Sequence, residues 1–336
     1  ATEVASRSFD VEVDLLCDYR TERTWASFRL KFDNAAGVFG GSFDKLKTDR
    51  AYFGTRLLDR DTYIVDAELG RRKLSAMFDS KIEFDAIFDG ILLKYDQSFD
   101  KIGEFYIHAG TFVINERRDH YGYVGEIGLL EVANTGFYTK YSLIDWDTKD
   151  YPKELITKQG TFFNLNKRFD FIVSQWLLGY KFIPDSFPKL INFYLAGLYN
   201  PAAQKHKLTD HKRANWGAYG GFSVGQLKKQ GDWAFDANYQ AVAAQAIPDF
   251  DAGGIGLGNA AKTGLYTINI DGTKGSATKD TAGGNTNFRG FQLTLEYLLT
   301  NTLNLFQQYQ QSVTLDSHIG PYRRYSQYEL ELIYAF

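Results

Sequence analysis

The sequence alternates between apolar and polar residues in one segment after another, along the whole chain. In residues 9–20 every second residue is apolar and the residues between are polar, apart from Leu16. Residues 25–33 repeat this pattern, with Arg29 and Lys31 on the polar side. Successive side chains of a β-strand point to opposite faces, so the alternation predicts strands with one apolar and one polar face. The chain is therefore expected to be all-β.

We expect about 16 such strands of about ten residues each, the length that a tilted strand needs to cross a bilayer. They are residues 9–20, 25–33, 37–43, 50–58, 62–71, 86–96, 104–114, 121–131, 136–146, 168–182, 190–200, 215–225, 232–242, 288–299, 303–312 and 324–336. Short connections alternate with long ones, and the long ones (147–167, 201–214 and 243–287) are expected at one end of the molecule. No linker divides the chain, so residues 1–336 are expected to form one domain.

Composition excludes several classes of protein. The mean hydropathy is −0.33, and no apolar run approaches the roughly 18–20 residues of a membrane-spanning helix. A net charge of −3 gives no indication of nucleic-acid binding. A single cysteine, Cys17, excludes an internal disulfide framework and a cysteine metal site. The chain starts at Ala1 without a leader, as expected of a processed secretory protein.

Alternation alone does not separate a membrane barrel from a soluble β-sandwich or propeller. Aromatic residues near the expected strand ends favour the barrel, because membrane barrels carry aromatic girdles at both interfaces. They are Tyr19, Trp25, Tyr52, Tyr63, Trp146, Trp216, Trp233 and Tyr334.

Several stretches resemble bacterial outer-membrane proteins. The closing segment 324–336, ending on Phe336, resembles the terminal strand of outer-membrane β-barrels. DRAYFGTRL, GTFVINE, GGNTNFRGFQLTLEYLLTNTL and a strand ending in Gly-Arg before a loop with Phe-Asp resemble the putative-porin family of diffusion channels. The resemblance implies a transmembrane, antiparallel, up-and-down barrel in the bacterial outer membrane, surrounded by lipid. It also implies a homotrimer, with the loop after strand 5 folded inward so that residues 72–85 narrow the pore.

Charged residues in and around this loop fit that role. Ten residues are candidates for the pore constriction: the bases Arg29, Lys31, Arg56, Arg71, Arg72 and Lys73, and the acids Asp79, Glu83, Asp85 and Asp89. Opposed acids and bases across a narrow aqueous pore produce a transverse field that selects ions and orients dipolar solutes. The alternative for each residue is a charge that only solvates the lumen or a loop.

The predicted function is passive diffusion of small hydrophilic solutes and ions, since a barrel of 16–18 strands encloses an aqueous channel. Neither catalysis nor a cofactor is expected. Ser317 and His318 are the one adjacent nucleophile–base pair considered, and neighbours on a strand face opposite ways. The glycine-rich residues 253–264 lack the spacing of a phosphate-binding loop. The alternative function is a surface adhesin or receptor acting through long loops such as 243–287. For this loop the sequence leaves a second alternative, that it folds over the pore.

Overall fold

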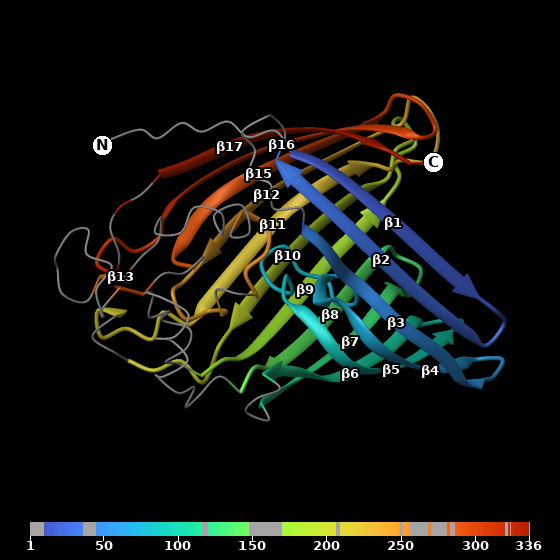
Figure 1. The fold of residues 1–336 in the computed structure, drawn as a ribbon, viewed down its shortest axis with the longest axis horizontal. Coiled ribbons are helices and arrows are strands. Elements are labelled where there is room, and N and C mark those ends of the chain that lie inside the picture. The colour runs from blue at the N-terminus through green and yellow to red at the C-terminus, as the bar shows by residue number, and fades with distance from the viewer. Residues whose placement is uncertain are drawn as a thin grey trace.

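The structure is a computed structural model that describes residues 10–35, 45–115, 120–147, 170–205, 209–248, 251–255, 268–269, 281–282, 286–319, 322 and 324–335. Fifteen strands form one antiparallel sheet (Figure 1). They are β1 (Asp10–Arg20), β2 (Thr24–Ala35), β3 (Lys45–Asp59), β4 (Tyr63–Lys73), β5 (Ile87–Phe99), β6 (Gly103–Asn115), β7 (His120–Val132), β8 (Phe137–Asp145), β9 (Ile172–Phe182), β10 (Ile191–Tyr199), β11 (Trp216–Gly225), β12 (Trp233–Val242), β15 (Phe288–Leu298), β16 (Leu303–Thr314) and β17 (Arg324–Tyr334). β13 (Ile268–Asn269) and β14 (Thr281–Ala282) make a separate pair, and η1 (Leu74–Ala76) is a short 3-10 turn. No described residues form a helix long and apolar enough to span a membrane.

Each strand of the large sheet pairs with its neighbour in sequence, and the sheet curls into a barrel (Figure 1). Its two edges, β1 and β17, lie close together. Glu331 of β17 interacts electrostatically with Glu12 of β1 and with Lys31 of β2. The expected antiparallel, up-and-down β-barrel is confirmed.

The strand count differs from the expected 16. The predicted strand at residues 37–43 lies outside the described residues, and β2 pairs directly with β3, Ser27 opposite Tyr52. The sheet therefore has 15 described strands, and the long connection expected after strand 5 follows the fourth strand, β4.

The two ends of the barrel differ in their connections. One end carries short turns, such as residues 21–23, 60–62 and 299–302, and the other carries the long connections after β4, β8, β10 and β12. Because β2 pairs directly with β3, the sheet has one strand fewer than expected before β3. The turn at 21–23 therefore lies at the short-turn end, in agreement with its length. β17 also finishes at this end (Figure 1); Phe336 itself lies outside the described residues.

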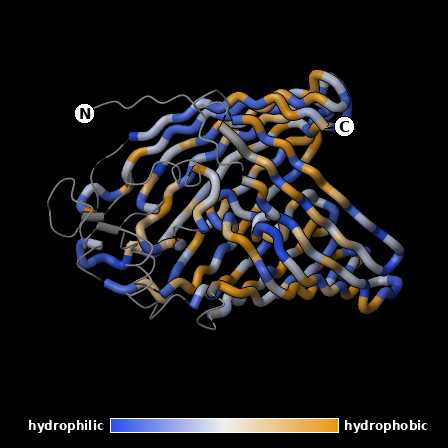
Figure 2. The backbone as a smooth tube through the Cα atoms, viewed as in Figure 1, coloured by the Kyte–Doolittle hydropathy of each residue, from blue (hydrophilic) through white to orange (hydrophobic). Residues whose placement is uncertain are grey.

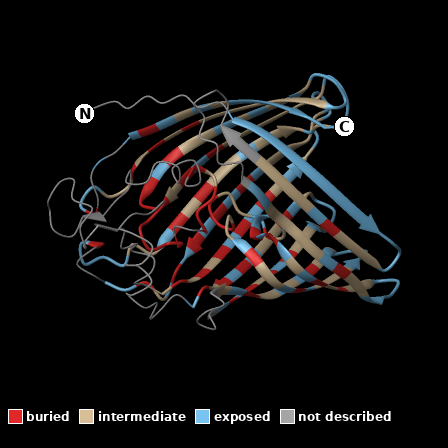
Figure 3. Ribbon diagram, viewed as in Figure 1, coloured by how far each residue is buried: buried red, intermediate tan, exposed pale blue. Residues whose placement is uncertain are grey.

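The outer face of the barrel is apolar. The register places Leu15 opposite Leu30 and Ile91 opposite Leu69 on this face, and all but Leu30 are exposed. Along the strands, hydrophobic residues alternate with hydrophilic ones (Figure 2), and exposed residues alternate with buried or intermediate ones in many strands (Figure 3). A soluble protein would bury so much apolar surface.

Aromatic rings form a belt around part of the outer face, at the short-turn end of β8 to β12. Successive ring centroids lie 4.5 to 6.2 Å apart. The belt consists of Phe137, Tyr180, Phe182, Phe193, Phe222 and Phe235. Three aromatics expected in a girdle lie elsewhere: Trp25 and Tyr52 contact inner charged groups, and Trp146 is buried.

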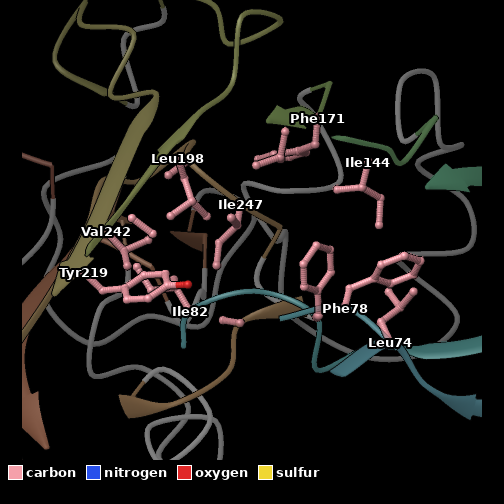
Figure 4. Packing of buried hydrophobic residues seen from close by; sticks show 14 of the residues in the cluster. Leu74, Phe78, Ile82, Ile144, Phe171, Leu198, Tyr219, Val242 and Ile247 are labelled. Atoms are coloured by element: carbon pink, nitrogen blue, oxygen red, sulfur yellow. The ribbon is translucent and has the colours of Figure 1, made fainter. Parts of the chain in front are cut away.

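Part of the interior is filled by an apolar core. Residues 74–86 connect β4 to β5, and residues 243–248 and 251–255 follow β12. They pack together against the inner faces of β5 to β12 (Figure 4). We call them the first and second inner segments. Among the described side chains on the inner faces of β1 to β4 and β15 to β17, only Phe288 belongs to this core.

Candidate functional site

The first inner segment leaves β4 and folds into the barrel because its apolar residues find partners there. Leu74, Phe78, Ile82 and Phe84 are at most 2% exposed. Phe78 and Phe84 lie ring to ring, 5.5 Å between centroids. Burying these side chains stabilises an irregular segment that has almost no regular secondary structure of its own.

The tip of this segment is fixed to strands that follow far along the chain. Asp79 Oδ2 lies 3.0 Å from Lys140 Nζ on β8. Lys81 Nζ lies 3.1 Å from Asp236 Oδ2 on β12 and above the ring of Tyr194, 5.3 Å from its centroid. The two ion pairs have opposite polarity and join the tip to two strands, β8 and β12, that lie four strands apart in the sheet.

A glutamine of β9 fixes the same tip through hydrogen bonds. Ser80 Oγ donates to Gln175 Oε1 over 2.7 Å, and Gln175 Nε2 donates to the carbonyl oxygen of Asp79 over 2.8 Å. Gln175 is the fourth residue of β9, counted from the end with the long connections. Asp236 is the fourth residue of β12, counted from the short-turn end. The tip therefore lies at the depth of the strands and well below the rim.

The second inner segment covers the first. Gly253 N donates to the carbonyl oxygen of Ile82 over 2.6 Å, and Asp85 N donates to that of Asp251 over 3.3 Å. Ala86 N donates to Asp251 Oδ1 over 3.0 Å. The two segments thus form a single unit inside the barrel.

Two acids are buried between these segments. Glu83 is 2% exposed and Asp251 is fully buried. Both oxygens of the Glu83 carboxyl and Oδ2 of Asp251 have no hydrogen-bond partner. Burial raises the pKa of both carboxyls above their ordinary values, and the charge of Asp251 raises that of Glu83 further.

Paired charges line the inner face of β1 and β2. Arg29 contacts Asp14, and Lys31 Nζ lies 2.5 Å from Glu12 Oε2. All four side chains are between 24% and 43% exposed, so water reaches them. Arg56 on β3 binds Asp66 of β4, with Nε 3.1 Å from Oδ1.

Glu68 on β4 joins a buried group on the same inner face. Its carboxylate accepts a hydrogen bond from Trp25 Nε1 over 2.9 Å and pairs with Arg72 and with Lys94 Nζ, at 2.9 Å from the lysine. Arg72 also lies 4.3 Å above the ring of Tyr52. Arg72 faces inward, but it is only 6% exposed and serves this buried group.

Three residues predicted for the constriction lie on the outer side. Arg71 and Asp89 are direct cross-strand partners and share the face of Leu69 and Ile91. Lys73, two residues beyond Arg71, has the same outward orientation. Arg71 binds Asp89 through two hydrogen bonds of 2.7 and 2.6 Å. Strand alternation thus corrects the prediction for Arg71, Lys73 and Asp89.

The three acids predicted on the loop, Asp79, Glu83 and Asp85, differ in burial and in their partners. Asp79 is half exposed and pairs with Lys140, and Asp85 pairs with Lys73 at 2.8 Å. Glu83 is buried beside Asp251. Asp79 therefore pairs with an inner-face charge, that of Lys140. Asp85 pairs with the outward-facing Lys73, and among the described residues Glu83 pairs with no charged base.

For the loop at 243–287, the sequence left open a surface element or a segment folded over the pore, and it did not indicate which residues fold inward. The apolar inner faces beneath both segments were missed. A signal was available: β9, IVSQWLLGYKF, carries apolar residues on both faces, with Val173 and Leu177 on the inner one, whereas β1 alternates with charges. A near-continuous apolar strand is typical of a strand covered on both faces.

Comparison with known proteins identifies the architecture. No family model and no curated protein matches the sequence. The structure is similar to OprB of Pseudomonas putida, with a TM-score of 0.53 at 11% identity over 93% of this chain and 83% of that one. It is also similar to OmpF of Salmonella typhi, solved in complex with daunomycin, with a TM-score of 0.50 at 11% identity over 99% and 93% of the two chains. The fold is that of a porin-like β-barrel.

Proposed function

We propose that this chain is an outer-membrane porin that lets small hydrophilic solutes and ions diffuse passively through its lumen. The observation that carries the proposal is the contrast between the two faces of the same strands. Leu15 and Leu30 face outward and are apolar, while Glu12, Arg29 and Lys31 face inward and are accessible to water. An apolar outer band with a polar interior is the arrangement of channel-forming barrels.

The membrane location rests on the outer surface. Its exposed apolar side chains extend from β1 to β17, and hydrocarbon is the environment that removes them from water. The aromatic belt on β8 to β12 suits the interface at the short-turn end, where aromatic rings collect in membrane barrels. The short turns would then face the periplasm and the long connections the outside.

The proposed path runs between the inner segments and the charged inner faces of β1 to β4. Arg29, Lys31 and Arg56 line it from the wall, and Asp79 lines it from the first inner segment. Because these charges have opposite signs, we propose a channel that orients dipolar solutes and admits ions of both signs. We further propose a homotrimer in the membrane and no catalytic step.

Single-channel recording in a planar lipid bilayer with a salt gradient tests the proposal. Purified, folded protein should produce discrete conductance steps, grouped in threes for a trimer, and the reversal potential gives the ion preference. The same sample unfolded by heat is the control and should be silent. A folded barrel that never conducts would contradict the channel function.

A further inference from the structure

Glu83, which lies beside Asp251, stands apart from the other acids described on the inner side of the barrel. The others described above have a cation or hydrogen-bond donor beside them: Glu68 has Arg72 and Lys94, and Asp79 has Lys140. Glu83 has no partner for either oxygen although it is buried. Two ionised carboxylates cannot remain adjacent in such a place, since desolvation and repulsion both oppose the charged form.

One proton shared by the pair removes this conflict. Asp251 Oδ1 accepts a hydrogen bond from Ala86 N, which favours its charged form. Glu83 has no such donor, so we assign the proton to Glu83 and the charge to Asp251. A metal ion is a poorer explanation, because the described residues contain no group of three His, Cys, Asp or Glu side chains able to hold one.

The charged and titratable groups around the pair do not supply a counter-charge. Asp85 is electrostatically coupled to Asp251 and adds negative charge, and Tyr219 on β11 is the titratable group of the wall coupled to Glu83. The nearby bases are engaged elsewhere, Lys73 with Asp85 and Lys81 with Asp236. A proton therefore remains the neutralising group.

We propose that Glu83 and Asp251 form a proton-dependent latch that holds the two inner segments together and sets how open the pore is. The pair lies within the ladder that joins the segments: Gly253 to Ile82, and Asp85 and Ala86 to Asp251. Loss of the shared proton places two negative charges in one buried site. The segments then separate and water enters between them.

The direction of the pH effect follows from linkage. The latched state keeps its proton until the pH passes the pKa of the Glu83 carboxyl, which burial and the charge of Asp251 raise well above its ordinary value. Acids exposed in a released state titrate near pH 4. Stabilisation of the latched state is therefore complete below about pH 4 and declines as the pH rises from there toward the raised pKa of Glu83. The released fraction should grow by up to about tenfold per pH unit in this range and then level off.

Thiol labelling of the folded protein tests the latch without requiring conductance. In a Cys17→Ser background, Ala252→Cys places a thiol beside Asp251 at a position that is 3% exposed. Ser317→Cys, at an exposed position, is the matched control that corrects for the pH dependence of the reagent. The ratio of the two labelling rates should rise at least tenfold between pH 6 and pH 8.5.

Two neutral variants show whether the acid pair is responsible. Adding Glu83→Gln to the labelled protein should keep the ratio low at every pH. Asp251→Asn is the second variant and should weaken the response, because it removes the repulsion and leaves only the burial of Glu83. Asp85→Asn is the control, because it removes a neighbouring acid and leaves the pair intact. A ratio that is constant in the parent protein, or that rises equally with Glu83→Gln, would overturn the latch.

Two further measurements distinguish a proton from a cation at the pair, and distinguish failure of the latch from failure of the proposed channel function. A ratio that changes with added Ca²⁺ or EDTA at fixed pH would replace the proton with a cation and overturn the proposal. The effect on conductance rests on the proposed function: the open fraction in the bilayer should rise with pH in the parent and stay constant with Glu83→Gln. A pH-dependent labelling ratio in a silent barrel would support the latch while contradicting the channel.

Discussion

At the scale of single residues, glycines on the inner face make room for aromatic rings from neighbouring strands. A Cβ at Gly179 would lie 2.0 Å from Tyr138 Cζ, and a Cβ at Gly128 would lie 2.1 Å from Tyr106 Cε1. Each ring therefore occupies the position of a missing side chain. These glycines leave the space that the neighbouring rings fill, which explains why glycine occurs within otherwise regular strands.

A glycine pair on adjacent strands tests this. Gly179→Ala should destabilise the barrel by about 1–3 kcal/mol, because the new methyl group displaces the Tyr138 ring. Gly197→Ala on β10 is the control, since nothing lies within 4 Å of its Cβ position. Urea unfolding followed by tryptophan fluorescence measures both. Equal stability of the two variants would contradict the packing role.

The buried carboxylate of Glu68 is the second residue that we expect to be critical. Glu68→Gln should cost about 3–5 kcal/mol of unfolding free energy, because it leaves Arg72 and Lys94 near each other without their anion. Glu104→Gln, at an exposed position, is the control. The midpoint of urea unfolding should fall only for the first variant.

At the scale of elements, the first inner segment has almost no secondary structure and depends on the strands around it. Its tip is fixed by charges on β8 and β12 and by Gln175 on β9. Weakening one contact should alter the position of the tip before it affects the barrel, whose strands have their own ladders.

The ion pair between Lys81 and Asp236 gives a test at this scale. A partly exposed pair contributes up to about 1 kcal/mol, so Lys81→Met should change the ratio of conductance substates about fivefold. Lys189→Met is a close control: Lys189 also pairs with an aspartate, Asp232, and lies 5.7 Å from an aromatic centroid, that of Trp233. Its channel should behave like the parent channel.

Ion selectivity distinguishes inner from outer acids. Asp79→Asn removes a half-exposed acid from the inner segment and leaves Lys140 unpaired, so the reversal potential should shift toward anions. Asp89→Asn removes an acid whose partner, Arg71, is on the outer face, and should leave the reversal potential unchanged. The opposite pattern would place the path elsewhere.

At the scale of the whole molecule, the strand register places neighbouring residues on opposite faces of the barrel wall. Cys17 lies opposite Phe28 on the outer face, and its neighbour Asp18 lies opposite Ser27 on the inner face. In a membrane the first faces lipid and the second faces water.

These neighbouring positions test the arrangement in lipid vesicles. A charged maleimide should label Asp18→Cys in a Cys17→Ser background and leave the native Cys17 unlabelled. A lipid-soluble maleimide should label Cys17. Both proteins should first be shown to be folded by their heat-modifiable migration. Labelling of Cys17 by the charged reagent alone would reverse the two faces.

The sequence determined the strands and their two faces, because an exact period of two assigns each residue to a face without knowledge of its neighbours. This is why the all-β barrel, the inward direction of Arg29, Lys31 and Arg56, and the irregular segment before β5 could be predicted. The same rule, applied fully, would have placed Arg71 and Asp89 outside.

Tertiary structure alone decided what fills the interior. Asp251 approaches Glu83 from 168 positions along the chain, and no local pattern records such a contact. Whether the inner face of a strand meets water or a folded-in segment depends on loops whose conformation is set by packing. The buried acid pair, and with it the proposed latch, follows from that packing.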